Sequence, residues 1–215
     1  MHGREPLAFA PRRRGFGPTD VSAALRRVVG GYLLLAILAT ALVLALRDGL
    51  PWVHPAPWLA LGGAGAAFTS AAMGLSFSMA IVLATRVAVP RFRWARRLHG
   101  ELRPVARGLS PAHVLLVAGL SSLGEELVFR SLLTPMVGVV GSAVLFGLAH
   151  QMKGPSRWVW VAWATVVGLG LGAIFALTGS LVGPIVAHAV VNAVNLAFLR
   201  AYDPDADPVA RGDVA

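Results

Sequence analysis

AHVLLVAGLSSLGEELVFRSLLT, residues 112–134, is the segment from which the fold class of this chain is most directly predicted. Ser110 and Pro111 precede it as a helix-start signal, and Pro135 is predicted to end the helix. At about 1.5 Å per residue, a helix of this length crosses a bilayer core of about 30 Å. The stretch therefore predicts a transmembrane helix, and this helix carries two adjacent glutamates and an arginine.

Five further apolar stretches have the character of membrane spans, because they contain no charged residue. They cover residues 28–46, 58–85, 137–151, 158–177 and 181–199. Hydrophobic residues make up 56% of the 215-residue chain and charged residues 13%, whereas soluble domains carry about a quarter charged residues. The sequence predicts an all-α fold, a polytopic transmembrane helical bundle of about six spans.

The positive charges predict the orientation of this bundle. The net charge is +9, and the basic residues are 18 arginines and one lysine. With the N-terminus in the cytoplasm, 17 of them fall on the cytoplasmic side, Arg47 falls outside and Arg130 lies within a span. Such a bias predicts that both termini are cytoplasmic. Little soluble surface remains for a nucleic-acid interface, so we expect no nucleic-acid partner.

The spans divide the chain into four segments. These are a basic cytoplasmic segment (1–27), two spans with a basic interfacial segment (28–109), a four-helix transmembrane core (110–200) and a tail predicted to be disordered (201–215). Within the second segment, residues 86–107 interleave arginines with Phe92, Trp94 and Leu98. We expect this part to lie on anionic lipids. The chain has no cysteine, which excludes disulfides and thiol chemistry.

Glu125 and Glu126 lie side by side within a predicted span, where a charge costs at least about 2.5–3.5 kcal/mol. Arg130 follows Glu126 by four residues, so the two share a helix face and are predicted to form an ion pair. Glu125 is rotated by about 100° from Glu126 and has no such counter-ion. The spacing assigns Glu126 and Arg130 to structural support and makes Glu125 a candidate general base.

Further polar side chains stand within or at the ends of the spans. His150 lies at the end of the fourth span, one turn after Phe146, and His188 and Asn192 share a face of the sixth at i, i+4 spacing. Asn195 lies one position off that face. The remaining histidines considered, His54, His99 and His113, are predicted to be interfacial or solvated and receive no role.

Straight helices would place the candidate side chains at different depths in the membrane. Glu125 and His188 lie roughly 20 Å and 17 Å from the cytoplasmic ends of straight spans, counted at about 1.5 Å per residue. His150 lies only about 5–10 Å in by the same count. If the three side chains meet, the fourth helix must be tilted, displaced or set deep in the bundle, next to a cavity open to the cytoplasm.

Three motifs carry a family resemblance. Residues 125–130, EELVFR, match EExxxR; residues 146–150, FGLAH, match FxxxH; residues 188–192, HAVVN, match HxxxN. In this order, each on its own predicted span, they resemble the CAAX-protease and bacteriocin-processing family, also called the abortive-infection family, of intramembrane glutamate proteases. The resemblance covers roughly residues 110–200, with Ser131 where many relatives have glycine.

The resemblance implies a catalytic role for four residues and a supporting role for three others. Glu125 and His150 would activate a water for attack on a peptide carbonyl, and His188 and Asn192 would donate hydrogen bonds to the developing oxyanion. Glu126, Arg130 and Phe146 would support the site. No metal cofactor is implied, and the substrate would be a peptide or a membrane protein. Independently of the resemblance, the arginine-rich composition favours a bacterial source. We therefore expect the protein in the inner (plasma) membrane of a bacterium, and we do not expect a prenylated substrate.

Three alternatives stay open at this stage. A zinc-dependent membrane hydrolase could use Glu125, His150 and His188 as ligands, although the HExxH string is absent. A non-enzymatic scaffold or immunity factor could retain the polar cluster for stability. A proton-coupled transporter could use it as a relay, although the chain shows no clear inverted repeat.

Overall fold

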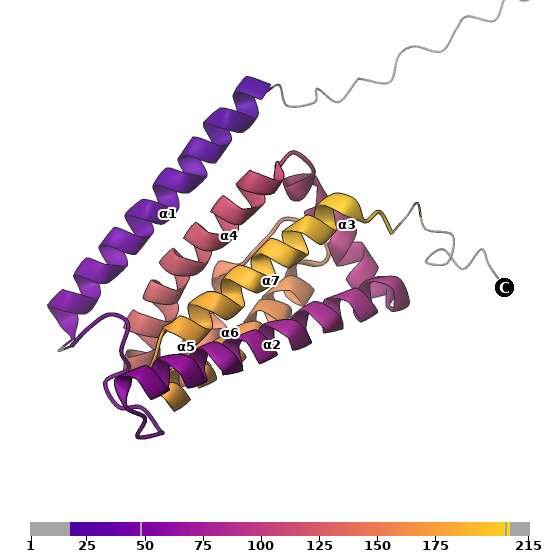
Figure 1. Ribbon diagram of the computed structural model, residues 1–215. Helices are drawn as coiled ribbons and strands as arrows, with labels where there is room; N and C mark the ends of the chain where they lie inside the picture. Colours follow the sequence, from indigo (N-terminus) through magenta and orange to yellow (C-terminus); the bar gives the residue numbers. More distant parts are fainter. Residues whose placement is uncertain (1–17, 48, 205, 207–215) are drawn as a thin grey trace, which may run out of the picture.

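The structure is a computed structural model that describes residues 18–47, 49–204 and 206 (Figure 1). The helical elements in this part of the chain are α1 (Pro18–Leu46), α2 (Gly63–Arg91), α3 (Arg93–Arg107), α4 (Pro111–Glu126), the π-helix η1 (Leu127–Leu133), α5 (Thr134–Ala149), α6 (Arg157–Thr178) and α7 (Val182–Ala201). Among the described residues, five helical stretches are long and apolar enough to cross a membrane, and the stretch Pro111–Ala149 contains the third predicted span and all but the last two residues of the fourth. The predicted all-α transmembrane bundle is confirmed.

α7 lies between α4 and α2, while α1 lies at the edge of the bundle against α4 and η1 (Figure 1). α5 and α6 pack against each other. Small residues allow α2 and α7 to approach closely, because a Cβ atom at Gly74 would clash with the Gly183 carbonyl. Ser70 accepts a hydrogen bond from Gly183 N–H at 2.9 Å and donates one to the Ser180 carbonyl at 2.8 Å. Such close contacts with hydroxyl hydrogen bonds are typical of transmembrane helix pairs.

A reversal at Gly138 separates the third predicted span from the fourth. The prediction that Pro135 ends the helix is wrong, because Pro135 lies in the first turn of α5, where its missing N–H is tolerated. The helix breaks at Gly138, with φ 75° and ψ 170°, a conformation that is strained for residues with a Cβ. Beyond it the chain runs back, so that the rings of Phe129 and Phe146 lie 5.0 Å apart.

The loop of residues 47–62 joins α1 to α2 and is longer than predicted, because α2 begins at Gly63 rather than at residue 58. Three prolines in the loop oppose helix formation. The loop instead bonds to the C-terminal end of α6, where His54 N–H donates to the Gly179 carbonyl at 2.9 Å. His54, predicted to be interfacial or solvated, is buried with its ring 5.0 Å from that of Phe175.

The basic segment 86–107 folds as the last turns of α2 and as the separate helix α3. The exposed face of α3 carries Arg93 and Arg97, and its opposite face buries Leu98 and His99. The prediction that His99 is interfacial or solvated is therefore wrong: burial lowers the pKa of its imidazole, and a hydrogen-bond contact of 3.1 Å with the Tyr202 carbonyl opposes that shift.

The beginning of the C-terminal tail packs on α3, where Arg103 pairs with Asp203 at 2.7 Å. The prediction of a disordered tail therefore fails for residues 202 and 203, which α3 binds through polar contacts. Residues 205 and 207–215 lie outside the described residues, as do residues 1–17, which contain most of the predicted basic N-terminal segment. The remainder of that segment belongs to α1, which begins ten residues before the predicted first span.

Candidate active site

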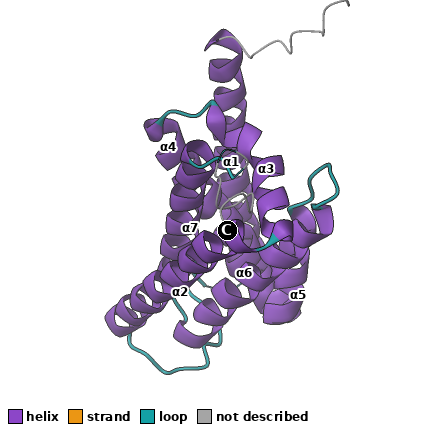
Figure 2. Ribbon diagram, turned by 90° about the vertical axis from the view of Figure 1, so that its right-hand side faces the viewer, coloured by secondary structure: helices purple, strands orange, loops and turns teal. Residues whose placement is uncertain are grey.

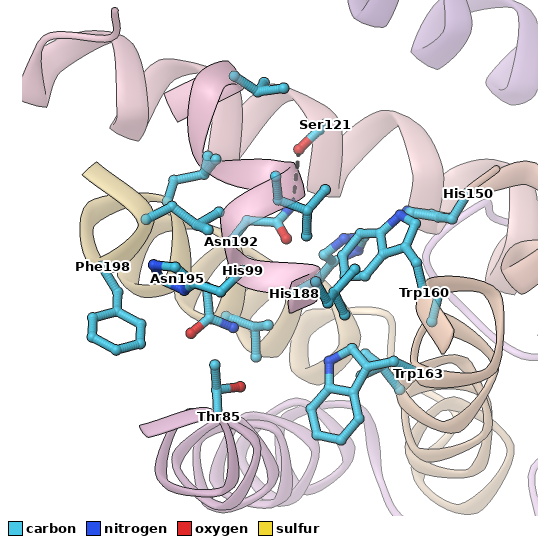
Figure 3. Close-up of a pocket in the computed structure, with 18 of the residues that line it drawn as sticks. Thr85, His99, Ser121, His150, Trp160, Trp163, His188, Asn192, Asn195 and Phe198 are labelled. Atoms are coloured by element: carbon cyan, nitrogen blue, oxygen red, sulfur yellow. Dashed lines mark hydrogen bonds between the residues drawn. The ribbon is translucent and has the colours of Figure 1, made fainter. Parts of the chain in front are cut away.

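A cavity of about 320 Å³ lies inside the bundle and reaches from α3 to Glu125. Much of its wall is apolar and includes three tryptophans, Trp94 of α3 and Trp160 and Trp163 of α6. Figure 3 shows the polar side chains His188, Asn192 and Asn195, which α7 contributes to the same cavity. The cavity thus combines apolar walls with a polar inner end.

The Glu125 carboxylate lies at that inner end. Its Oε1 atom accepts a hydrogen bond of 3.0 Å from the Tyr32 hydroxyl of α1. Its Oε2 atom lies 3.6 Å from His150 Nε2 and 3.8 Å from His188 Nε2, distances too long for direct hydrogen bonds. Oε2 has no hydrogen-bond partner among the described residues. α4, α5 and α7 therefore bring the candidate base and both candidate histidines together.

The Glu126 carboxylate points away from the cavity and is fully buried. Its Oε2 lies 3.1 Å from Arg130 Nε, and its Oε1 lies 2.7 Å from His188 Nδ1. Arg130 also donates to the Gly168 carbonyl of α6 at 3.3 Å. The ion pair expected from the i, i+4 spacing is present, and it links α4 and η1 to α6 and α7.

The acceptors beside the two histidines determine where their ring hydrogens lie. His150 Nδ1 lies 2.8 Å from the Phe146 carbonyl, and His188 Nδ1 lies 2.7 Å from the Glu126 carboxylate. Because a carbonyl and a carboxylate only accept hydrogen bonds, we assign the hydrogen to Nδ1 in both rings. In the neutral rings each Nε2 then directs a lone pair toward Glu125.

Two polar contacts join α4 to α7 one helical turn apart. Asn192 Nδ2 donates to Ser121 Oγ at 3.1 Å, as the dashed line in Figure 3 marks. One turn further, His188 contacts the two glutamates at the end of α4. Ser121 and Glu125 are four residues apart, as are His188 and Asn192, so the two helix faces match in antiparallel register.

The Phe146 ring packs at the centre of this group and is 2% exposed. It lies 4.3 Å from the His150 ring and 5.7 Å from the His188 ring, and the Arg130 guanidinium lies 4.4 Å from its centroid. Such contacts, including the cation–π contact, restrict how the neighbouring side chains turn. Phe146 thus has the surroundings expected of a supporting residue.

The reversal at Gly138 explains how His150 reaches the level of Glu125. Gly138 lies 13 residues after Glu125 and 12 residues before His150, so the two arms of the helical hairpin have nearly equal length. α5 ends at Ala149, and the connection to α6 is held by Glu101 of α3, which accepts from the Ser156 hydroxyl at 2.9 Å. Figure 2 shows this connection as a loop beside α3 and α5.

Sequence reasoning assigned no role to two residues of the site, Tyr32 and Ser121. Tyr32 is one of two tyrosines in the chain and stands in an uncharged span, which marks it as a polar group that needs a partner. Ser121 precedes Glu125 by four residues and therefore shares its helix face. Both features can be read from the sequence, although neither predicts which side chain Tyr32 or Ser121 bonds to.

The zinc alternative requires three donor atoms that point toward one position. Among the described residues, no group of three or more His, Asp or Glu side chains has an arrangement that could hold a metal ion. The Nε2 atoms of His150 and His188 nevertheless both face Glu125. Chelation therefore remains a direct experimental test of a metal requirement.

Comparison with known proteins gives a family match for the segment that contains these residues. Residues 107–194 match the family described as type II CAAX prenyl endopeptidase Rce1-like. The family resemblance is confirmed over this segment. The chain is also 25% identical to uncharacterized protein YpbD of Bacillus subtilis (strain 168) over 128 residues, which are 59% of this chain and 67% of that protein. No solved structure matches the chain significantly.

Proposed function

We propose that this protein is a metal-independent intramembrane endopeptidase of the CAAX-protease type. The observation that carries the proposal is the position of Glu125 Oε2, which faces His150 Nε2 at 3.6 Å and His188 Nε2 at 3.8 Å inside a cavity. A water molecule beside these three atoms would lie within hydrogen-bond reach of each. The family match over residues 107–194 supports the same chemistry, because it contains all three residues.

The proposed reaction begins when Glu125, assisted by His150, takes a proton from this water. The water oxygen bonds to the carbonyl carbon of the substrate peptide, whose oxygen becomes the oxyanion. When this intermediate collapses, the C–N bond breaks and the proton held by Glu125 passes to the leaving nitrogen. These roles need a base and a proton donor within hydrogen-bond distance of the reacting atoms.

Asn192 and His188 are the proposed oxyanion donors. Asn192 keeps one N–H for this purpose, since the other donates to Ser121. A donor role for His188 requires a hydrogen on Nε2 as well as on Nδ1, hence an imidazolium ring. Glu126 Oε1 lies 2.7 Å from Nδ1 of this ring and would balance its charge while Glu125 holds the proton taken from water.

The proposed substrate is a peptide or membrane protein that enters the cavity from the side of α3. The positive-inside bias predicts that this side is cytoplasmic, where the exposed arginines of α3 would contact anionic lipids. The arginine-rich composition favours the inner membrane of a bacterium as the location. Membrane proteomes of cells with wild-type protein or Glu125→Gln identify the substrate as the precursor that accumulates in the variant.

Purified protein in proteoliposomes, given a peptide that spans the cleavage site of this precursor, tests the proposal. We expect Glu125→Gln to abolish cleavage and Asn192→Ala to lower the rate by about 10²–10³. The matched control is His113→Gln, at a histidine of α4 that does not line the cavity; it should cleave at the wild-type rate. Full cleavage by Glu125→Gln would contradict the proposal, as would inactivation by a chelator that zinc reverses.

A further inference from the structure

α1 lies outside the segment that matches the family, yet it contributes a hydrogen bond to the candidate base. The matched segment begins at residue 107, and α1 ends at Leu46. Tyr32, in the middle of α1, donates its hydroxyl to Glu125 Oε1 at 3.0 Å. Most other side chains of α1 are exposed on the outside of the bundle, among them Leu34 at 56%.

Gly124 permits this contact, because α1 crosses α4 directly beside Glu125. A Cβ atom at Gly124 would lie 3.2 Å from the Tyr32 carbonyl oxygen and 3.4 Å from Leu35 Cδ2. The first of these distances is shorter than an ordinary van der Waals contact. The backbone of α1 therefore lies close enough for the Tyr32 ring to reach the carboxylate of the next residue of α4.

We infer that Tyr32 is a positioning residue for Glu125, an inference that rests on the proposed function. The terminal torsion of a glutamate side chain is broad, so an unrestrained carboxylate can turn either oxygen toward the histidines. The Tyr32 hydroxyl binds Oε1 and leaves Oε2 directed at His150 and His188. α1 thereby completes the site, although the family motifs all lie on other helices.

Kinetics of Tyr32→Phe in proteoliposomes test this role. A hydrogen bond to a charged group contributes about 1.5–3 kcal/mol, so kcat should fall roughly 10-fold or more. KM should stay within about twofold, because Tyr32 acts through Glu125 rather than by binding the peptide. The matched control on the same helix is Leu34→Ala, whose side chain faces away from the site and which should keep the wild-type kcat.

Thermal unfolding in detergent tests the contact without any measurement of activity. The four proteins of a double-mutant cycle are compared: the wild type, Tyr32→Phe, Glu125→Ala and the double variant. Tyr32→Phe should lower Tm by about 3–12 °C in the wild-type background. The same substitution should have little effect when Glu125 is alanine, because the acceptor is already absent.

The two measurements separate the inference from the proposed function. Additive shifts in Tm, or an unchanged kcat in Tyr32→Phe, would overturn the role of Tyr32. A wild-type protein that cleaves no peptide would overturn the proposed function instead, and the unfolding cycle alone would then decide whether Tyr32 holds Glu125.

Discussion

Two arginine–glutamate pairs in this chain have the same i, i+4 spacing and opposite surroundings. Glu126 and Arg130 are 0% and 1% exposed, whereas Arg97 of the pair Arg97–Glu101 is 64% exposed. An exposed pair contributes about 0–1 kcal/mol, but removing one partner of a buried pair leaves an uncompensated charge and costs about 3–5 kcal/mol. The buried pair is therefore the one whose loss the bundle cannot accommodate.

We predict that Arg130→Met lowers the free energy of unfolding by about 3–5 kcal/mol, because Glu126 then stays buried without its counter-ion. Arg97→Met, the matched control, should change it by less than about 1 kcal/mol. Unfolding in detergent, followed by the fluorescence of the tryptophans, measures both variants. If both variants lost the same small amount of unfolding free energy, the burial of Glu126 would not increase the contribution of its ion pair to stability.

At the scale of the element, the hairpin of α4, η1 and α5 determines which residues meet. Its two arms are nearly equal in length about Gly138, so Glu125 faces His150 and Phe129 faces Phe146. The positive φ of Gly138 is the local requirement for this register. Other residues adopt that conformation at a cost of about 1–3 kcal/mol.

Gly138→Ala should therefore destabilise the protein by about 1–3 kcal/mol and lower the cleavage rate more than the binding of peptide, since it displaces His150 from Glu125. Gly119→Ala is the control, because Gly119 is helical and a Cβ there would meet no atom within 4 Å. It should be neutral or slightly stabilising. Wild-type stability and rate for Gly138→Ala would argue against the hairpin register.

At the scale of the whole molecule, the loop of residues 47–62 and α3 mark the two ends of the bundle. The cavity opens from the site toward α3, and the connection between α5 and α6 is held at that end by Glu101. The bias of basic residues predicts that this end is cytoplasmic. The orientation follows from charge and remains a prediction for experiment.

The absence of cysteine from the chain makes a direct test possible. We predict that Trp52→Cys, at a side chain 55% exposed in the loop of residues 47–62, reacts with a membrane-impermeant maleimide in intact cells. Arg97→Cys, on the exposed face of α3, should react only after the membrane is permeabilised. The opposite pattern of labelling would invert the predicted orientation.

The features that depend on local interactions could be predicted without a structure. Hydrophobic stretches of sufficient length predicted the all-α transmembrane bundle, because burial in a bilayer depends on the composition of each segment. The i, i+4 spacing predicted the Glu126–Arg130 pair for the same reason, since both partners belong to one continuous helical segment. The motifs named the candidate residues, whose catalytic roles await the experiments above.

The contacts between distant segments could not be predicted from the sequence and were found in the three-dimensional structure. Tyr32 and Glu125 are 93 residues apart, and Asn192 and Ser121 are 71 residues apart, so no helical period relates them. The depth of His150 likewise depended on where the hairpin turns, which a count from the end of each span could not show. The packing of helices against one another, rather than the content of any one helix, assembles this site.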